Sequence, residues 1–250
     1  MKIQYLTKFF GSKETTEMKE DRNLFELFKS LDPVSFFIPF GTCCLPAKTI
    51  ETLGLRRFSL PMDWLFTTNP MLVHCINDDF STFLDKKYYS FIPLHERPWG
   101  EDHSFCHHSF YRENHNANFV FNHFNPLEGP VYETLKRRTD RLINTLSSKE
   151  NKVFLNFSHD SCKKEDFIHL HNAIKEKYSN FSLVMISYNG ISTDGEFIKN
   201  VSFLDQSCYC EFYSFSKFTG DRFHADIDNS IIHSILSFMK KDAAFDFLKE

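Results

Sequence analysis

Two adjacent cysteines, Cys43 and Cys44, stand between a short apolar run and a segment with the signals of a helix. The run VSFFIPFG (34–41) ends at glycine and predicts a buried strand. Thr42 is placed to cap a following helix, and Pro46 suits its first turn, where a missing N–H costs nothing. Because free N–H groups at a helix N-terminus stabilise a thiolate, this turn is a candidate site for a cysteine nucleophile. Two small buried residues filling a tight turn would give the same pattern, and these features do not choose between the thiols.

A thiol nucleophile needs a base, and histidine is the usual one. Half of the twelve histidines are clustered in one stretch, namely His95, His103, His107, His108, His115 and His123. The segments 103–113 and 116–124 look extended and predict a β-hairpin. Neighbours on a strand point to opposite faces, so only one of His107 and His108 can face a given site. The alternative is a polar hairpin with imidazoles exposed to solvent.

A second candidate acid–base pair precedes the last expected helix. Asp221 and His224 have the D-x-x-H spacing by which SGNH-type hydrolases supply the acid and base of a triad. In those enzymes a serine follows the first strand, and GTCC (41–44) would be its thiol counterpart. The alternative is a helix start capped by its acidic residues.

Zinc-binding residue types also occur, at His103, Cys106, His107, Cys208 and Cys210. Structural zinc sites usually have paired C-x₂₋₄-C knuckles, and the sequence contains none. The seven cysteines are an odd number, and their two close pairs suit no disulfide, so reduced thiols in a cytosol fit better. We therefore expect no metal and no cofactor.

Composition excludes several classes of protein. A net charge of −4 without a run of five basic residues gives no reason to expect nucleic acid. No apolar run approaches ~20 residues, so no transmembrane segment is expected. Residues 1–23 lack the apolar core of a secretion signal, which favours a cytoplasmic protein. The 30 phenylalanines among 250 residues predict an aromatic-rich core.

From residue 130 onward, helical and strand patterns alternate. The segments are VYETLKRRTDRLINTLSS, VFLNF, EDFIHLHNAIKEKY, FSLVMISY, a loop, CYCEFYSF and a final helix IDNSIIHSILSFMKK. Such alternation predicts the α/β class, with a partly parallel central sheet flanked by helices. No linker or repeat interrupts the chain. We expect a single α/β domain over 1–250, with a polar leader at 1–30 and an insert at about 55–130 that carries the histidine-rich hairpin.

Three stretches together resemble one family. They are FGTCCLPA, LGLRRFSLPMDWLF and INDDFSTFLD, within residues 35–85. They are similar to the N-terminal signature of a little-characterised family described as putative papain-like cysteine peptidases. In that pattern a cysteine precedes L-P-A, and P-x-D-W follows. The later FCHHSF (105–110) is similar to the family's F-x-H-D-F segment.

The resemblance implies roles for particular residues. It marks Cys44, immediately before Leu45-Pro46-Ala47, as the nucleophile, and it also marks Asp63 and Trp64. His108 becomes the expected base, with His107 as the alternative. Ser109 stands where the family usually has an aspartate. Asn122 is then the candidate to orient the base.

Three functions are therefore open. The first is a cysteine-dependent acyl-transfer enzyme, a hydrolase or an acyltransferase, acting on a glycan, peptide or small-molecule conjugate. The second is an SGNH-like esterase or O-acyltransferase that uses Asp221 and His224. The third is a non-enzymatic module that binds a glycan or a protein. The side chains that lie around Cys44 distinguish the three.

Overall fold

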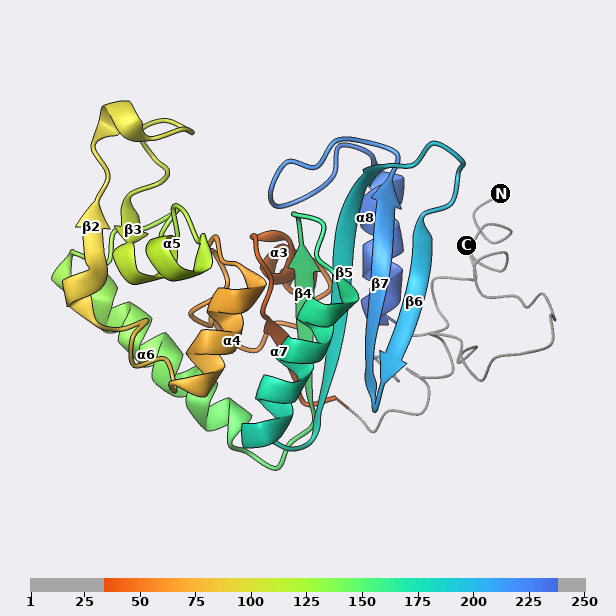
Figure 1. Cartoon of the computed structure of the whole chain (residues 1–250), viewed down its shortest axis with the longest axis horizontal. Coiled ribbons are helices and arrows are strands. Elements are labelled where there is room, and N and C mark those ends of the chain that lie inside the picture. The colour runs from red at the N-terminus through yellow and green to blue at the C-terminus, as the bar shows by residue number, and fades with distance from the viewer. Residues whose placement is uncertain (1–33, 238–250) are drawn as a thin grey trace.

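A five-stranded sheet forms the centre of the computed structural model, which describes residues 34–237 (Figure 1). Its strand order is β1-β4-β5-β7-β6, with the first four strands parallel and β6 antiparallel to β7. The strands are β1 (Phe36–Pro39), β4 (Lys152–Ser158), β5 (Phe181–Ile191), β6 (Ile198–Leu204) and β7 (Ser207–Ser214). The predicted α/β class is confirmed. The expected leader at 1–30 lies outside the described residues.

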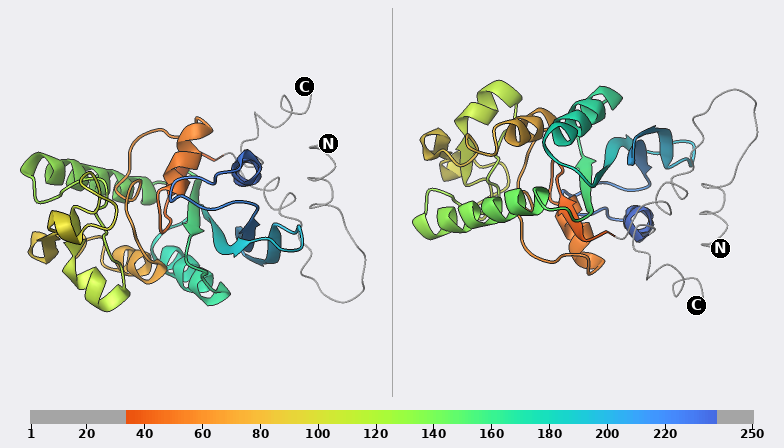
Figure 2. Two further views of the ribbon diagram at one scale, coloured as in Figure 1. Left: turned by 90° about the horizontal axis from the view of Figure 1, so that it is seen from above. Right: turned by 90° about the horizontal axis from the view of Figure 1, so that it is seen from below.

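Helices cover both faces of this sheet (Figure 2). On one face lie α3 (Leu45–Thr52) and α8 (Asp226–Ser237), and on the other lie α4 (Asn69–Asn77) and α7 (Lys164–Lys177). Alternate residues of each strand point to opposite faces of the sheet and pack in two separate apolar clusters. Val153 packs with Ile50 of α3 and Ile232 of α8, whereas Phe154 packs in the cluster of α4 and α7. The strands thus bury both faces, as parallel strands do.

The helix after β1 and the helix after β4 lie on opposite faces of the sheet. α3 contributes Leu45 and Ile50 to one cluster, while α7 contributes Phe167 and Leu170 to the other. The two chain segments therefore separate at the carboxyl ends of β1 and β4. In open α/β sheets such a switch point is where a crevice for ligands forms.

The residues between α4 and β4 form a second body of packed elements beside the sheet (Figure 1). It contains η1 (Lys86–Tyr88), η2 (Leu94–Glu96), α5 (Ser109–His115), α6 (Gly129–Leu146) and a two-stranded antiparallel sheet of β2 (Tyr89–Phe91) and β3 (Cys106–His108). The core here is rich in aromatic side chains, with the rings of Phe83 and Tyr89 both in contact with Phe121. The expected small antiparallel element is present.

Three local expectations were wrong. The strand partner of β3 is β2, and residues 109–115 form α5 where an extended segment was expected. Residues 116–124 instead make one isolated bridge, Cys106 to Phe121. The expected loop between β5 and β7 contains the edge strand β6, whose residues are nearly all half-buried and show no clear apolar pattern.

None of the helices within residues 34–237 is long and apolar enough to cross a bilayer.

Candidate functional site

The turn that carries the two cysteines is fixed against β4. Thr42 N–H donates to the Phe157 carbonyl at 3.0 Å, and Thr67 Oγ1 donates to the Gly41 carbonyl at 2.7 Å. A Cβ on Gly41 would lie 2.7 Å from the nitrogen and 2.8 Å from the oxygen of Phe157. Real Cβ atoms essentially never come this close to backbone, so only glycine allows the turn to approach β4.

Cys44, and not Thr42, occupies the N-cap position of α3. The Thr42 hydroxyl lies instead 2.8 Å from Nδ1 of His159, at the end of β4. The backbone N–H of Cys44 donates no hydrogen bond to any residue between 34 and 237. The turn thus places a thiol and a free N–H at the same helix start, where the helix dipole favours negative charge.

The two thiols have different environments. Cys43 belongs to the apolar cluster of α3 and α8, and burial raises its pKa far above the usual value. Cys44 is also buried, which raises its pKa to about 12, and the charge of Asp221 adds to this shift. Among the described residues, the hydrogen-bonding partner of Cys44 Sγ is His123 Nε2, at 3.4 Å. The resting thiol is protonated and lies in contact with an imidazole.

The neighbour of His123 determines which of its ring nitrogens carries the proton. The Asn122 Oδ1 atom accepts hydrogen bonds from Ser104 N at 2.9 Å and Ser104 Oγ at 3.1 Å, so the amide Nδ2 must face His123. That Nδ2 lies 3.2 Å from His123 Nε2. Since Nδ2 can only donate, Nε2 is the unprotonated nitrogen and accepts from both Asn122 and the Cys44 thiol.

Burial and the nearby His103 both lower the pKa of His123, while Asp221 raises it. The rings of His103 and His123 lie 5.1 Å apart. The indole of Trp64 packs edge-on against His123 at 6.3 Å between ring centroids. The imidazole is therefore neutral near pH 7, and the rings of His103 and Trp64 flank it, although the residue remains exposed to solvent.

Asp63 forms a buried ion pair next to Trp64. Its Oδ2 lies 2.5 Å from Arg56 Nη2 and accepts the Leu60 N–H at 3.1 Å. The guanidinium of Arg56 lies over the Trp64 ring, 5.8 Å from its centroid. Asp63 therefore fixes the loop that holds Trp64 against His123, and no hydrogen bond joins it to Cys44 or His123.

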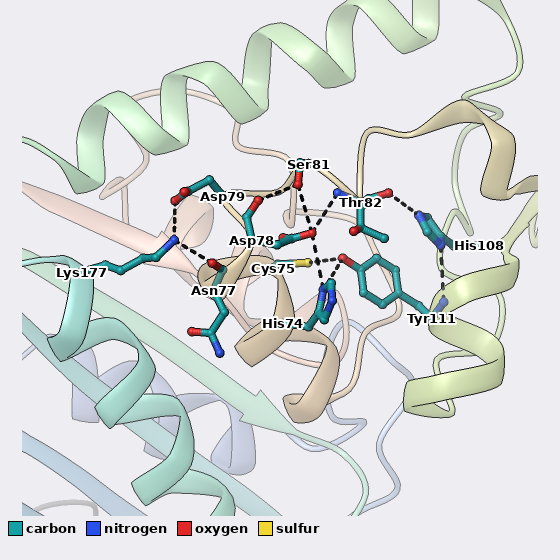
Figure 3. Close-up of polar contacts among 10 residues, drawn as sticks. All are labelled: His74, Cys75, Asn77, Asp78, Asp79, Ser81, Thr82, His108, Tyr111 and Lys177. Atoms are coloured by element: carbon teal, nitrogen blue, oxygen red, sulfur yellow. Dashed lines mark hydrogen bonds and ion pairs between the residues drawn. The ribbon is translucent and has the colours of Figure 1, made fainter.

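His108, the expected base, is hydrogen-bonded to Thr82 and Tyr111 (Figure 3). Its Nε2 contacts the Thr82 carbonyl at 3.0 Å, and its Nδ1 accepts the Tyr111 N–H at 3.5 Å, which caps α5. Burial lowers its pKa to about 4. His107 Nδ1 accepts the Phe119 N–H at 3.3 Å. Both histidines hold the insert together, and the structure brings His123 to Cys44 in their place.

Asp221 and His224 are not joined to each other by any contact in the described part of the chain. Asp221 accepts from Thr219 Oγ1 at 3.3 Å, and His224 is exposed, with its N–H donating to the Lys217 carbonyl. The charge of Asp221 nevertheless reaches Cys43, Cys44 and His123. The D-x-x-H pair is thus split, and its acidic member faces the site.

The zinc-type residues do not converge. Between residues 34 and 237, no three histidine, cysteine, aspartate or glutamate side chains are grouped so that they could hold a metal ion. All seven cysteines are free thiols and buried.

The histidine that the sequence did not single out is His123. It follows Asn122 at the end of the segment that bridges to β3, and the Asn122 neighbour was itself a candidate. An Asn-His pair directly after a short apolar run is the only local signal. The contact with Cys44 spans 79 positions in the sequence.

One comparison with known proteins identifies a family. The family model described as "Putative papain-like cysteine peptidase (DUF1796)" matches residues 35–190, which include Cys44, Asn122 and His123. Neither the curated proteins nor the solved structures contain a match to this chain. Because the match covers more than half of the 250 residues, the chain belongs to the family of putative papain-like cysteine peptidases.

Proposed function

We propose that the protein is a cysteine-dependent acyl-transfer enzyme in which Cys44 is the nucleophile and His123 is its general base. The observation that carries this proposal is the 3.4 Å contact between Cys44 Sγ and the unprotonated Nε2 of His123. A thiol beside the lone pair of an imidazole is the arrangement that nucleophilic catalysis requires. Membership of a cysteine peptidase family supports the same chemistry.

In this reaction Nε2 takes the thiol proton as Sγ attacks a carbonyl carbon. The helix-terminal N–H of Cys44 then stabilises the oxyanion. The imidazolium returns the proton to the leaving group, and water or an acceptor molecule removes the acyl group from Sγ. The substrate is a peptide, a glycan conjugate or another small acyl compound, and the second step is hydrolysis or transfer.

The raised pKa of Cys44 and the lowered pKa of His123 describe the resting state. Both shifts favour the neutral thiol and imidazole over a preformed thiolate–imidazolium pair. The proton is therefore transferred during the attack. Asn122 acts as a positioning residue, because its amide holds the His123 ring with Nε2 toward the thiol.

The experiment that tests this proposal compares Cys44→Ala with Cys43→Ala. The rate of alkylation by iodoacetamide is measured for the folded protein, and the modified peptide is identified by mass spectrometry. We expect labelling at Cys44 that Cys44→Ala abolishes and Cys43→Ala preserves. Labelling at Cys43 alone, or an equal loss in both variants, contradicts the proposal.

A further inference from the structure

A second imidazole contacts the turn that carries Cys44. His159 follows β4, and its Nδ1 lies 2.8 Å from Thr42 Oγ1, two residues before Cys44. The backbone N–H of His159 also donates to this hydroxyl, at 3.1 Å. The side chain is about one-third exposed, so it faces the solvent side of the turn. No candidate role derived from the sequence involves His159.

The Thr42 hydroxyl determines which His159 nitrogen carries the proton. The hydroxyl has one hydrogen, and its two acceptor neighbours are His159 Nδ1 at 2.8 Å and the Phe157 carbonyl at 3.3 Å. That carbonyl already accepts the Thr42 N–H at 3.0 Å. The hydroxyl can donate to either of them, and donation to the nearer Nδ1 leaves the ring proton on Nε2. The Asp160 carboxylate beside Nε2 favours this arrangement over the one in which Nδ1–H donates to the hydroxyl.

The position of Nε2 agrees with this assignment. It lies 3.4 Å from a carboxylate oxygen of Asp160, an acceptor that suits an N–H donor. Asp160 is almost fully exposed and can move away when another acceptor enters. Nε2–H is thus a donor held at a fixed place by Thr42, with a partner that solvent can replace.

His123 and His159 approach the turn from different parts of the fold. β1 is an edge strand whose neighbour in the sheet is β4. His159 directly follows β4, whereas His123 lies in the insert, between α5 and α6. The carboxyl ends of β1 and β4 are also the switch point, where a ligand is expected to enter. Each imidazole contacts this turn, His123 at Cys44 and His159 at Thr42.

We propose that His159 is a catalytic residue of the Cys44 site, and that its Nε2–H donates a hydrogen bond to the carbonyl oxygen of a bound ester, thioester or amide. This inference rests on the proposed function. When the Cys44–carbon bond forms, the carbonyl π electrons move to that oxygen, and the thiol proton goes to His123. His159 keeps its own proton throughout. When the tetrahedral intermediate collapses, the bond to the leaving group breaks, and His123 supplies that group with a proton.

An imidazole Nε2–H suits this task because it donates a hydrogen bond to the oxygen on which negative charge develops. Together with the free N–H of Cys44 it gives the oxyanion two donors, one from the backbone and one from a side chain. The role of Thr42 is positional: without its hydroxyl, Nδ1 could hold the ring proton and Nε2 would become an acceptor.

The test uses two reagents that both modify Cys44 in the full-length protein. p-Nitrophenyl acetate develops an oxyanion when the thiol attacks it, whereas methyl methanethiosulfonate is attacked at sulfur and has no carbonyl. Cys44→Ala gives the background from the other thiols. We expect His159→Phe to lower the rate of acetylation about 100-fold, the size reported for loss of one oxyanion donor, and to leave the thiosulfonate rate within about twofold.

Thr42 provides a second pair of variants that does not depend on His159→Phe folding correctly. We expect Thr42→Val to lose acetylation selectively, and Thr42→Ser to recover most of that loss. His95→Phe, at an exposed site away from Cys44, is the matched control and leaves both rates unchanged.

The remaining outcomes separate the two proposals. Equal loss of both rates in His159→Phe means that His159 acts on the thiol, and no loss of acetylation means that it does not touch the carbonyl oxygen; either result overturns the inference alone. Failure of both reagents to modify Cys44 in the unaltered protein overturns the proposed function and the inference with it.

Discussion

Cys44 Sγ and His123 Nε2 lie 3.4 Å apart, although 79 positions separate them in the sequence. The thiol comes from the start of a helix on the central sheet, and the imidazole comes from the insert. The contact therefore depends on how the insert packs against the turn. Residues that hold that packing affect the chemistry without touching a substrate.

Replacing His123 should remove the base without removing the nucleophile. We expect His123→Gln to slow iodoacetamide alkylation of Cys44 by about 10²–10⁴-fold at pH 7, the range for loss of general base catalysis. In the variant, the rate should rise with pH toward the thiol pKa of about 12. The rate is measured between pH 5 and 10, with the exposed His95→Gln as the control. A rate at pH 7 equal to that of the unaltered protein excludes His123 as the base.

Changing Asn122 should move the pH dependence of the site. The base works only when His123 is neutral, and burial holds its pKa below 6.5, so activity is lost as the pH falls through that lowered value. Asn122→Asp replaces a donor to Nε2 with an anionic acceptor, which stabilises the imidazolium and raises the pKa of His123. We measure the rate of Cys44 alkylation against pH, and we expect the fall in rate on the acid side of this profile to shift to higher pH. An unchanged profile means that Asn122 does not contact the base in solution.

The sequence supports the prediction of some parts of this site better than others. The strand, the glycine turn and the helix around Cys44 are specified by neighbouring residues, so local rules predict them. Cys44 was preferred to Cys43 only through the family resemblance, and the apolar packing of Cys43 is consistent with that preference. The position of His123 depends on packing between distant segments, which no local pattern records.

Residues 103–124 show how local patterns mislead. Their aromatic and histidine content predicts two strands, yet residues 109–115 form a helix that His108 caps. His108 then has both ring nitrogens engaged and cannot serve Cys44. The resemblance pointed to a histidine in the correct region of the chain, and tertiary packing selected another one.

Gly41→Ala tests the close approach of the turn to β4. The new methyl group would overlap backbone atoms of Phe157, and backbone cannot move aside cheaply. We expect the free energy of unfolding to fall by about 1–3 kcal/mol, with a loss of Cys44 reactivity. Urea unfolding measures the change. Gly129→Ala, where nothing lies within 4 Å of an added Cβ, is the control and should be nearly neutral. Equal effects of the two substitutions would show that the turn can shift.

His108 should make the fold sensitive to acid. Its pKa is about 4 in the folded protein against an ordinary value of 6.5, so the unfolded chain binds the proton first as the pH falls. Its contribution is present above pH 6.5 and is lost as the pH falls toward 4. We expect His108→Gln to reduce the loss of stability between pH 7 and pH 5 by about 2 kcal/mol. Urea unfolding at both pH values tests this, with His95→Gln as the control. An unchanged pH dependence would show that His108 is not buried as a neutral ring.

Loss of the ion pair between Asp63 and Arg56 should lower the stability of the fold directly. It should lower the reactivity of Cys44 indirectly, through the loop that carries Trp64. Asp63→Ala leaves a guanidinium without its buried partner, and we expect a loss of about 2–4 kcal/mol. Trp64 fluorescence should change as its loop relaxes. Glu51→Gln removes only the exposed partner of Arg56 and should have little effect. A reactive Cys44 in a fully stable Asp63→Ala protein contradicts this role.

The pairing of β1 with β4 has a consequence for the order of events during synthesis. The hydrogen bond from Thr42 to Phe157 joins residues 115 positions apart. At ~5–20 residues per second, a ribosome needs roughly 6 to 23 s to make the intervening chain. Until β4 has emerged, the turn before Cys44 has no neighbouring strand to hold it. In a nascent chain the site around Cys44 is therefore not yet assembled. The reactivity of the thiol arises only late in folding.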